Sequence, residues 1–234
     1  MNSFGRGHDW LAAAVMGCMA TIAVAATTLP EQMVGEAACG RIDSGALGPF
    51  DYRDRANSDL LKNVNSNHFN SDVRQLIRGQ TSHAVLADLD YILRHFPNHH
   101  DALRVTARYF LEEGRKLQFL SAECYFDRAL RGYPEDIEVR QIFSMYLSRR
   151  SRYPEAIKQL EIAMELHPGP SMELHYNLGL LYADLGDFDK ANQHASIAYG
   201  MGHPLPGLRD KLLRLGHWRP HAAVDSAKSD GQSR

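Results

Sequence analysis

The sequence predicts an all-α protein built as a stack of helical hairpins, and two observations lead to this prediction. From about residue 67 onward, apolar residues recur at the spacing of an amphipathic helix. Small residues, aromatic residues and prolines also recur at intervals of 34 to 37 residues. The columns are Ala122, Ala156 and Ala191; Ala129, Ala163 and Ala198; Ala107, Ser144 and Gly179; Phe119, Tyr153 and Phe188; and Pro97, Pro134, Pro168 and His203. Such a fixed period indicates repeat units that stack on one another.

Residues 1–26 predict a secretory signal peptide. Arg6 precedes an uncharged apolar run, "WLAAAVMGCMATIAVAA", which ends in small residues. A basic start, an apolar run and a small-x-small cleavage site are the parts of such a signal. We therefore expect a periplasmic or secreted protein that keeps no membrane-inserted segment after cleavage. An uncleaved anchor and a lipid anchor at Cys18 of "VMGC" are alternatives, although the apolar run continues past that cysteine.

Removal of the signal would leave two cysteines, Cys39 and Cys124. An even number of cysteines in an oxidising compartment favours pairing. The sequence thus predicts a disulfide that joins the N-terminal segment to the helical stack. Cys124 follows Ala122 by two residues, which places it off the face packed within its unit, so we expect it to be partly exposed. Two free thiols are the alternative.

Residues 27–66 predict an irregular segment, because they are rich in Gly, Asp, Asn and Ser and show no sustained helical period. Phe50 and Tyr52 supply rings that can hold such a coil on the rest of the protein. The stretch "NSDLLKNV" favours one or two turns of helix. Packing of residues 39–66 into a groove of the stack is a further reading of this segment.

Residues 67–216 predict the helical repeat domain, with about four hairpins followed by a single capping helix over 203–216. In the first hairpin, which is degenerate, the apolar residues Phe69, Val73, Leu76 and Ile77 follow a helical spacing. A capping helix is expected because a repeat array must cover its last apolar face. Residues 217–234 are polar and small and predict a disordered tail.

Small residues explain how the last hairpin closes. In "YNLGLLYADLGDFDKANQHASIAYGMG", residues 176–202, two short helices break at Gly186. Gly179 lies on the first helix, and Ala191 and Ala198 lie on one face of the second because they are seven residues apart. Small side chains let two helices approach closely, so we expect close packing at these positions.

These units resemble the tetratricopeptide repeat. "YNLGLLYADLGDFDKA" followed by "ASIAY" carries the pattern most specifically, "FSMYLSRRSRYPEAIKQLEIAMELHP" matches well, and "TARYFLEEGRK" with "FLSAECYFDRALRGYP" matches with an insertion. The resemblance extends over residues 67–202. It implies a right-handed superhelix of helix pairs with a concave groove that holds a peptide or a partner helix, and it implies no catalysis.

By helical spacing, the face of each first helix that points away from the second would line this groove. These positions are Arg104, Arg108 and Leu111; Gln141, Met145, Ser148 and Arg149; and Tyr176, Leu180, Ala183 and Asp184. Arg104, Arg108 and Arg149 suggest a basic patch that binds carboxylates of a partner segment through charge-assisted hydrogen bonds. Asn177 is the candidate for the amide that some tetratricopeptide domains use in this way. The alternative is a solvated helix face.

His95, His99 and His100 in "RHFPNHHDA" are weak candidates for metal binding. No cysteine or paired carboxylate in this stretch completes a ligand set, so a polar turn between two helices is the alternative. We predict no cofactor.

Composition and motifs narrow the function. A formal net charge of −2 gives no indication of the basic face that nucleic-acid binding requires. Nucleophile-elbow, zinc-protease and phosphate-loop motifs are absent from the sequence, so we do not expect an enzyme. The sequence predicts a scaffold that binds another protein in the bacterial envelope. A periplasmic metal- or small-ligand-binding protein and a non-catalytic regulatory subunit of an envelope complex are the alternatives.

Overall fold

The computed structural model describes residues 39–42, 48–81, 83–114 and 118–219, and the regular structure within these ranges is helical throughout. The elements are η2 (Arg55–Asn57), α2 (Ser58–His68), α3 (Ser71–Arg74), α4 (Val85–His95), α5 (His100–Glu112), α6 (Ala122–Gly132), α7 (Ile137–Arg149), α8 (Tyr153–Leu166), α9 (Met172–Leu185), α10 (Phe188–Gly200) and α11 (Gly207–Arg214). The all-α prediction is confirmed.

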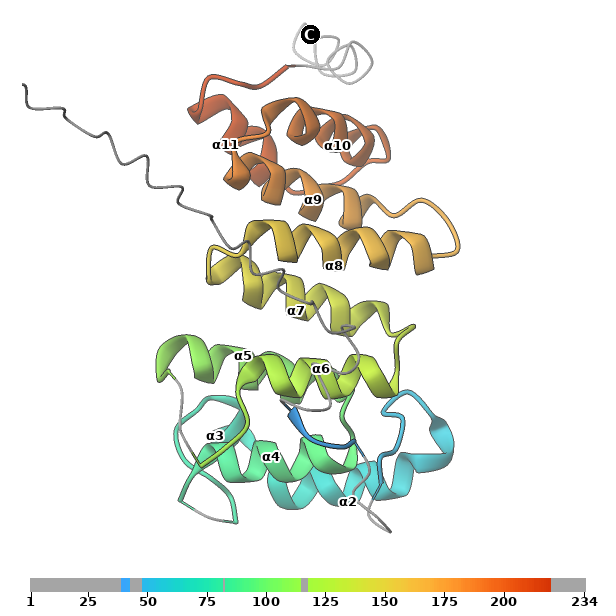
Figure 1. Ribbon diagram of the computed structural model, residues 1–234, viewed down its shortest axis with the longest axis vertical. Helices are drawn as coiled ribbons and strands as arrows, with labels where there is room; N and C mark the ends of the chain where they lie inside the picture. Colours follow the sequence, from blue (N-terminus) through green and yellow to red (C-terminus); the bar gives the residue numbers. More distant parts are fainter. Residues whose placement is uncertain (1–38, 43–47, 82, 115–117, 220–234) are drawn as a thin grey trace, which may run out of the picture.

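The helices stack in sequence order along the long axis of the molecule (Figure 1). α5 and α6, α7 and α8, and α9 and α10 form hairpins, and the hairpins join through contacts of α5 with α7 and of α8 with α9. A hydrophobic core runs from α2 to α11 without interruption. α11 packs on α9 and α10, so the expected capping helix is present.

Four of the five helices from α6 to α10 begin at a Ser or Asp residue whose side chain caps the helix. Ser121, Asp136, Ser171 and Asp187 each stand at the N-cap and accept a hydrogen bond from a backbone N–H in the first turn. These side chains satisfy donors that the helix itself leaves without partners. At the other end of α9, Gly186 has φ 86°, a conformation that favours glycine and ends the helix there.

The small residues of the last unit allow close helix packing, as predicted. Gly179, however, lies close to two other helices rather than one. A Cβ atom on Gly179 would lie 2.4 Å from Leu208 Cδ2 on α11 and 3.4 Å from the carbonyl oxygen of Ala191 on α10. The missing side chain therefore makes room for the capping helix as much as for the hairpin partner. Ser144 occupies the same column in α7, and its hydroxyl donates to the carbonyl of Ala156 on α8 at 2.9 Å.

The first hairpin differs from the prediction. Its first helix is α2, which packs on α4; the helix expected in "NSDLLKNV" is present, but it continues to His68 and takes the place of the first helix of the hairpin. The helix expected over residues 69–77 is wrong, because only the four-residue α3 forms there. Phe69 and Val73 are both buried, but Asn70 caps a new helix between them and Leu76 has φ 63°. The helical spacing of these residues therefore does not come from one helix. Phe69 follows the end of α2, and Val73 lies on α3.

The loop before α4 is held by a buried carboxylate. Asp88 accepts hydrogen bonds from the backbone N–H groups of Gln80 and Thr81, and it contacts His68 Nδ1 at 2.7 Å. A single side chain thus fixes the loop to the end of α2. The hydrogen bonds of Asp88 thus hold the loop in place of the apolar contacts that a helix longer than α3 would make.

The predicted signal peptide, including Cys18, lies wholly outside the residues that the structure describes, and the predicted tail lies mostly outside them. Among the helices that the structure describes, none is both long and apolar enough to span a membrane. The expected tail is wrong for residues 217–219, because Trp218 and its neighbours pack on α10. Residues 220–234 lie outside the described part.

Candidate functional site

The groove residues predicted from the sequence lie on the first helices of three consecutive hairpins, α5, α7 and α9. Met145 is at the equivalent position to Arg108 and Leu180, one residue after the small-residue column. Met145 is 62% exposed, and Ile77, Leu205 and Leu213 are exposed to a similar degree elsewhere in the molecule. Leu111 and Leu180 are half-buried.

The arginines of α5 do not form the open basic patch that the sequence suggested. Arg104 forms ion pairs with Asp101 on its own helix and with Glu138 on α7. Arg108 contacts Glu112 at 3.8 Å and donates to the carbonyl oxygen of Arg74 at 2.6 Å. The reason is that acidic residues share this face with the arginines. The positive charges are therefore largely neutralised before any partner arrives.

The predicted groove residues of α9 are covered by the capping helix and the loop before it. Tyr176 is 8% exposed and stacks on His203 with ring centroids 3.9 Å apart. A Cβ atom on Gly207 would lie 2.7 Å from the Tyr176 hydroxyl oxygen. Asp184 forms an ion pair with Lys211 of α11. Tyr176 and Asp184 thus join the C-terminal cap to α9, and Tyr176 is not open to a partner.

The accessible part of the face that was predicted to line a groove centres on α7, and we call it the groove surface. It consists of Leu111, Gln141, Met145, Ser148, Arg149, Asn177 and Leu180. The exposed thioether of Met145 lies in the middle of this surface, with the amide groups of Gln141 and Asn177 and the hydroxyl group of Ser148 around it. Arg149 is exposed at the end of α7. Charge pairs at α5 and α11 border it on either side. Such a surface suits a segment with apolar side chains and a polar backbone better than one rich in carboxylates.

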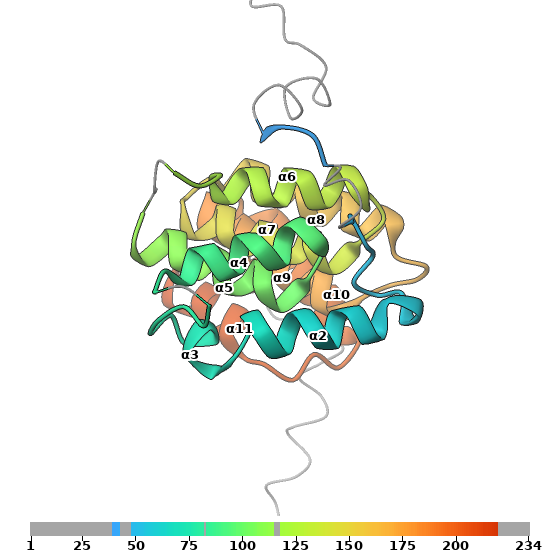
Figure 2. The same cartoon turned by 90° about the horizontal axis from the view of Figure 1, so that it is seen from below.

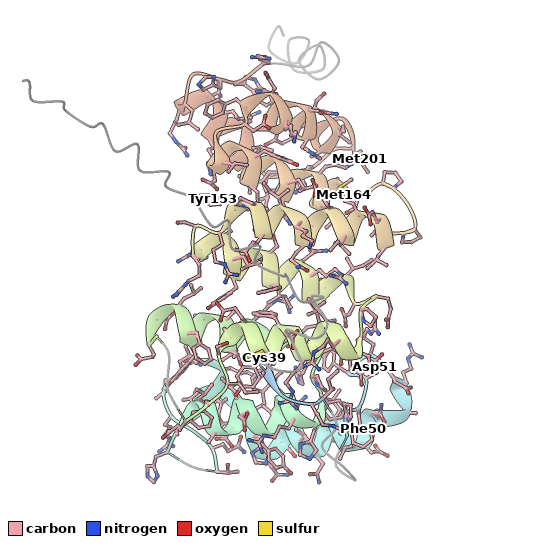
Figure 3. The ribbon with its side chains drawn as sticks, viewed as in Figure 1. Cys39, Phe50, Asp51, Tyr153, Met164 and Met201 are labelled. Carbon is pink, nitrogen blue, oxygen red and sulfur yellow. A yellow bond between two sulfur atoms is a disulfide. The ribbon has the colours of Figure 1, made fainter. Side chains whose placement is uncertain are left out.

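The N-terminal segment does not fill this surface in the part of it that the structure describes. Residues 39–42 run along α6, on the side of the stack opposite α5, α3 and α2 (Figure 2). Arg131 of α6 donates to the carbonyl oxygen of Gly40 at 2.8 Å. Figure 3 shows Cys39, Phe50 and Asp51 in the N-terminal half of the molecule, away from Met164 and Met201.

Cys39 lies directly against Cys124 of α6. The two sulfur atoms are 2.03 Å apart and the Cα atoms are 5.0 Å apart, a separation that a disulfide can bridge. Cys124 is 9% exposed, so the expected partial exposure is wrong. The reason is that Cys39 and its neighbours cover a face of α6 that its own hairpin leaves open.

The three histidines of the turn between α4 and α5 point to different partners. The ring of His95 donates from Nδ1 to the carbonyl of Tyr91 at 2.9 Å. His99 Nε2 lies 3.0 Å from Asn65 Oδ1, and its Nδ1 accepts from the N–H of Ala102 as the N-cap of α5. The described residues contain no group of three His, Cys, Asp or Glu side chains able to hold a metal ion.

The protonation states of His99 and Asp136 follow from this geometry. Burial lowers the pKa of His99 to about 4, which keeps the ring neutral and lets it act as a helix cap. His100 Nε2 lies 3.0 Å from both carboxylate oxygens of Asp136. Burial raises the pKa of Asp136, but hydrogen bonds from His100 and Asn98 outweigh that effect and leave the pKa below its ordinary value.

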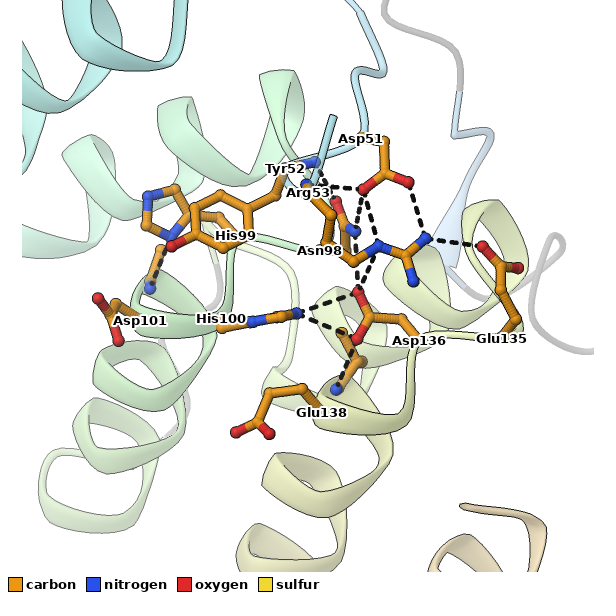
Figure 4. A network of polar contacts seen from close by, with 12 residues as sticks. Asp51, Tyr52, Arg53, Asn98, His99, His100, Asp101, Glu135, Asp136 and Glu138 are labelled. Carbon is orange, nitrogen blue, oxygen red and sulfur yellow. Dashed lines mark hydrogen bonds and ion pairs between the residues drawn. The ribbon is translucent and has the colours of Figure 1, made fainter. Parts of the chain in front are cut away.

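Sequence reasoning missed the network that joins this turn to the N-terminal segment (Figure 4). Asn98 is fully buried and donates to Asp51 at 2.8 Å and to Asp136 at 2.9 Å, while its side-chain oxygen accepts from the N–H of Tyr52. Hydrogen bonds from Arg53 hold the pKa of Asp51 well below its ordinary range. We call Asp51, Arg53, Asn98 and Asp136 the turn clasp. No spacing rule connects these positions, so only the polar turn itself was foreseeable.

Comparison with known proteins identifies the regular part of the stack. Residues 144–203 match the family model of the tetratricopeptide repeat. The match runs from the middle of α7 past the end of α10, and thus includes most of the groove surface. Tetratricopeptide repeats typically mediate contacts between proteins and are non-catalytic. No curated protein matches the chain.

Proposed function

We propose that this chain, which is a tetratricopeptide-repeat protein, is a non-catalytic scaffold of the bacterial envelope that holds a segment of another protein on the groove surface. The family supplies the general role of protein binding. The observation that carries the specific proposal is Met145, which is 62% exposed at the centre of the face that such repeats use for binding. Removal of this thioether from water on binding would contribute favourable free energy.

The groove surface also has the features that make a partner specific. Gln141 and Asn177 carry amide groups that can donate to and accept from the backbone of an extended segment. Leu111 and Leu180 lie half-buried on the neighbouring first helices. Arg149 supplies one positive charge at the end of α7. A partner segment with apolar anchors and few charges fits this arrangement.

Export to an oxidising compartment is the second part of the proposal. The apolar run in residues 1–26 supports it, as does the placement of Cys39 against Cys124. A disulfide is stable in the periplasm or outside the cell, and cytosolic reductants would remove it. Cell fractionation with detection of the mature N-terminus by mass spectrometry tests this part. Recovery of an unprocessed chain from the cytosol would contradict it.

The binding proposal is tested by a matched pair of variants in a pull-down from envelope extract. Met145→Glu places a charge at the centre of the groove surface, and Leu166→Glu places the same charge on the second helix of the same hairpin, where Leu166 is 40% exposed. We expect Met145→Glu to lower the recovery of the partner at least tenfold, and Leu166→Glu to leave it near the wild-type level. Equal recovery by both variants would overturn the proposal.

A photo-crosslinking amino acid gives an independent measurement. It is placed at position 145 or at position 166 of the full chain, and crosslinked partners are identified by mass spectrometry. We expect one protein to dominate the crosslinks from position 145 and to be missing from those at position 166. Crosslinks with the same set of proteins from both positions would show that the groove surface has no partner of its own.

A further inference from the structure

One stripe of α10 binds an extended segment of the chain. Phe188, Asn192 and Tyr199 follow one another at i, i+4 and i+11, so they lie on one face of the helix. In a longer array the next hairpin would cover this region. Here residues 217–219, which follow α11, lie across it instead.

Asn192 contacts the backbone of this segment at two points. Its side-chain nitrogen donates to the carbonyl oxygen of His217 at 2.9 Å, and its side-chain oxygen accepts from the N–H of Arg219 at 2.9 Å. The amide therefore brackets Trp218 from both sides along the chain. These contacts depend on an extended backbone and are independent of the side chains that the segment carries.

The side chains of the segment meet three further groups of α10. The ring of His217 stacks on Phe188 with centroids 3.7 Å apart and planes at 9°. Trp218 meets the ring of Tyr199 edge to face at 6.0 Å. Arg219 forms an ion pair with Asp189 at 2.7 Å. Ring stacking and edge-to-face packing each favour an aromatic partner, and Asp189 favours a cation.

The segment lies at the surface of the protein, with Trp218 half-buried and packed against the edge of the hydrophobic core. His217 and Arg219 are exposed, whereas Asn192 beneath them is 9% exposed. Gly216 precedes the segment with φ 75°, which turns the chain from α11 towards α10. Most of the contacts come from α10, and the N–H of His217 also donates to the carbonyl oxygen of Leu212 on α11 at 2.9 Å. A segment from another protein with the same three residue types would find the same partners.

We propose that the stripe formed by Phe188, Asp189, Asn192 and Tyr199 is a second interaction surface, distinct from the groove surface. It takes an extended segment that carries an imidazole or aromatic ring, then an aromatic residue, then an arginine. Residues 217–219 of the chain are its resident occupant. A partner that displays this pattern binds by displacing them.

The test uses a fluorescently labelled peptide of residues 215–219, Leu-Gly-His-Trp-Arg, with blocked ends, and the full-length protein. Trp218→Ala with Arg219→Ala weakens the resident segment but leaves the stripe intact. By fluorescence anisotropy we expect saturable binding of the peptide to this variant, at least tenfold tighter than to the wild type. A peptide with alanine in place of tryptophan is expected to bind at least tenfold more weakly.

A further variant tests the role of the stripe itself. Adding Asn192→Leu to the double variant removes both backbone contacts, and we expect it to abolish peptide binding. Circular dichroism establishes that each variant is folded, and if the double variant does not fold, Arg219→Ala alone replaces it with the same expectations. Failure of the folded variant to bind the peptide, or equal binding by the wild type, would overturn the proposal. The result does not depend on Met145, so it is separate from the test of the groove surface.

Discussion

The two ends of the stack are held together by different kinds of contact. At the C-terminal end, α9, α10 and α11 pack through small and apolar residues, with Ala191, Ala195 and Ala198 fully buried and Leu208 seated against Gly179. At the N-terminal end, the turn clasp and the Cys39–Cys124 contact tie helices to an irregular segment. The family model matches the first kind of structure and does not extend over the second.

The difference shows how one architecture tolerates irregular repeats. Where the repeat pattern is strong, neighbouring helices exclude water through direct contact, and each unit needs only the next one. Where it is weak, as around the short α3, buried polar groups and long-range links replace the missing helix contacts. Asn98 alone connects residues 51, 52 and 136. The N-terminal end should therefore respond to polar and redox changes and the C-terminal end to changes in side-chain volume, while each end holds a buried histidine that makes it respond to pH.

The largest expected effect is the loss of the proposed disulfide at the N-terminal end. In the double variant Cys39→Ser with Cys124→Ser, the linkage across a sequence separation of 85 is missing. On the chain-entropy model, closure of such a loop lowers the entropy of the unfolded chain and stabilises the fold by about 4.6 kcal/mol. Urea unfolding should show this loss, and hydrogen exchange should rise in α6 while α9 and α10 stay protected.

Reduction of the wild type provides the matching control. It should reproduce the behaviour of the double variant, and peptide mapping by mass spectrometry should detect the Cys39–Cys124 crosslink before reduction. Two free thiols in protein isolated from the envelope would contradict the proposed linkage.

The next effect is a loss of stability on acidification. His99 has a pKa of about 4 in the folded protein against an ordinary value near 6.5. Because the unfolded chain binds the proton more readily, the contribution of neutral His99 is complete above about pH 6.5 and is lost as the pH falls towards 4, about 3 kcal/mol in all. Thermal unfolding from pH 7 to pH 4 measures it.

Two variants separate the contribution of His99 at the N-terminal end to this pH dependence from that of His194 at the C-terminal end. His99→Asn keeps a residue able to cap α5 and should flatten the pH dependence of exchange in α5. His194 also has a pKa of about 4, lowered by burial and by His175, so His194→Gln should flatten the dependence in α10 instead. If His99→Asn left the pH dependence of α5 unchanged, His99 would not be its cause.

The smallest expected effect comes from added volume at the C-terminal end. Gly179→Leu places side-chain atoms where Leu208 Cδ2 lies 2.4 Å from the Cβ position. Overpacking of this kind costs about 2 kcal/mol, and it should release α11 first, as hydrogen exchange can detect. Gly200→Leu is the matched control, because a Cβ atom there meets nothing within 4 Å. Equal destabilisation by the two variants would show that the contact with Leu208 is unimportant.

Much of the regular half was predictable from the sequence, because its determinants are local. The break at Gly186, the capping helix and the hairpins of α7 to α10 follow from periodic small and apolar residues. The predicted groove residues do fall on α5, α7 and α9. The sequence did not reveal that Tyr176 is covered by His203 or that Arg104 is paired with Glu138, since both contacts join separate elements.

The sequence by itself determined that the chain forms helical hairpins of a fixed length, because hydrophobic period, capping residues and small side chains act within one unit. Tertiary structure alone decided how the irregular parts are held. It replaced the expected helix at Phe69 with α2, buried Asn98 among residues far apart in the sequence, and laid Trp218 on α10. Such contacts depend on which surfaces the folded stack leaves open, and no local pattern records that.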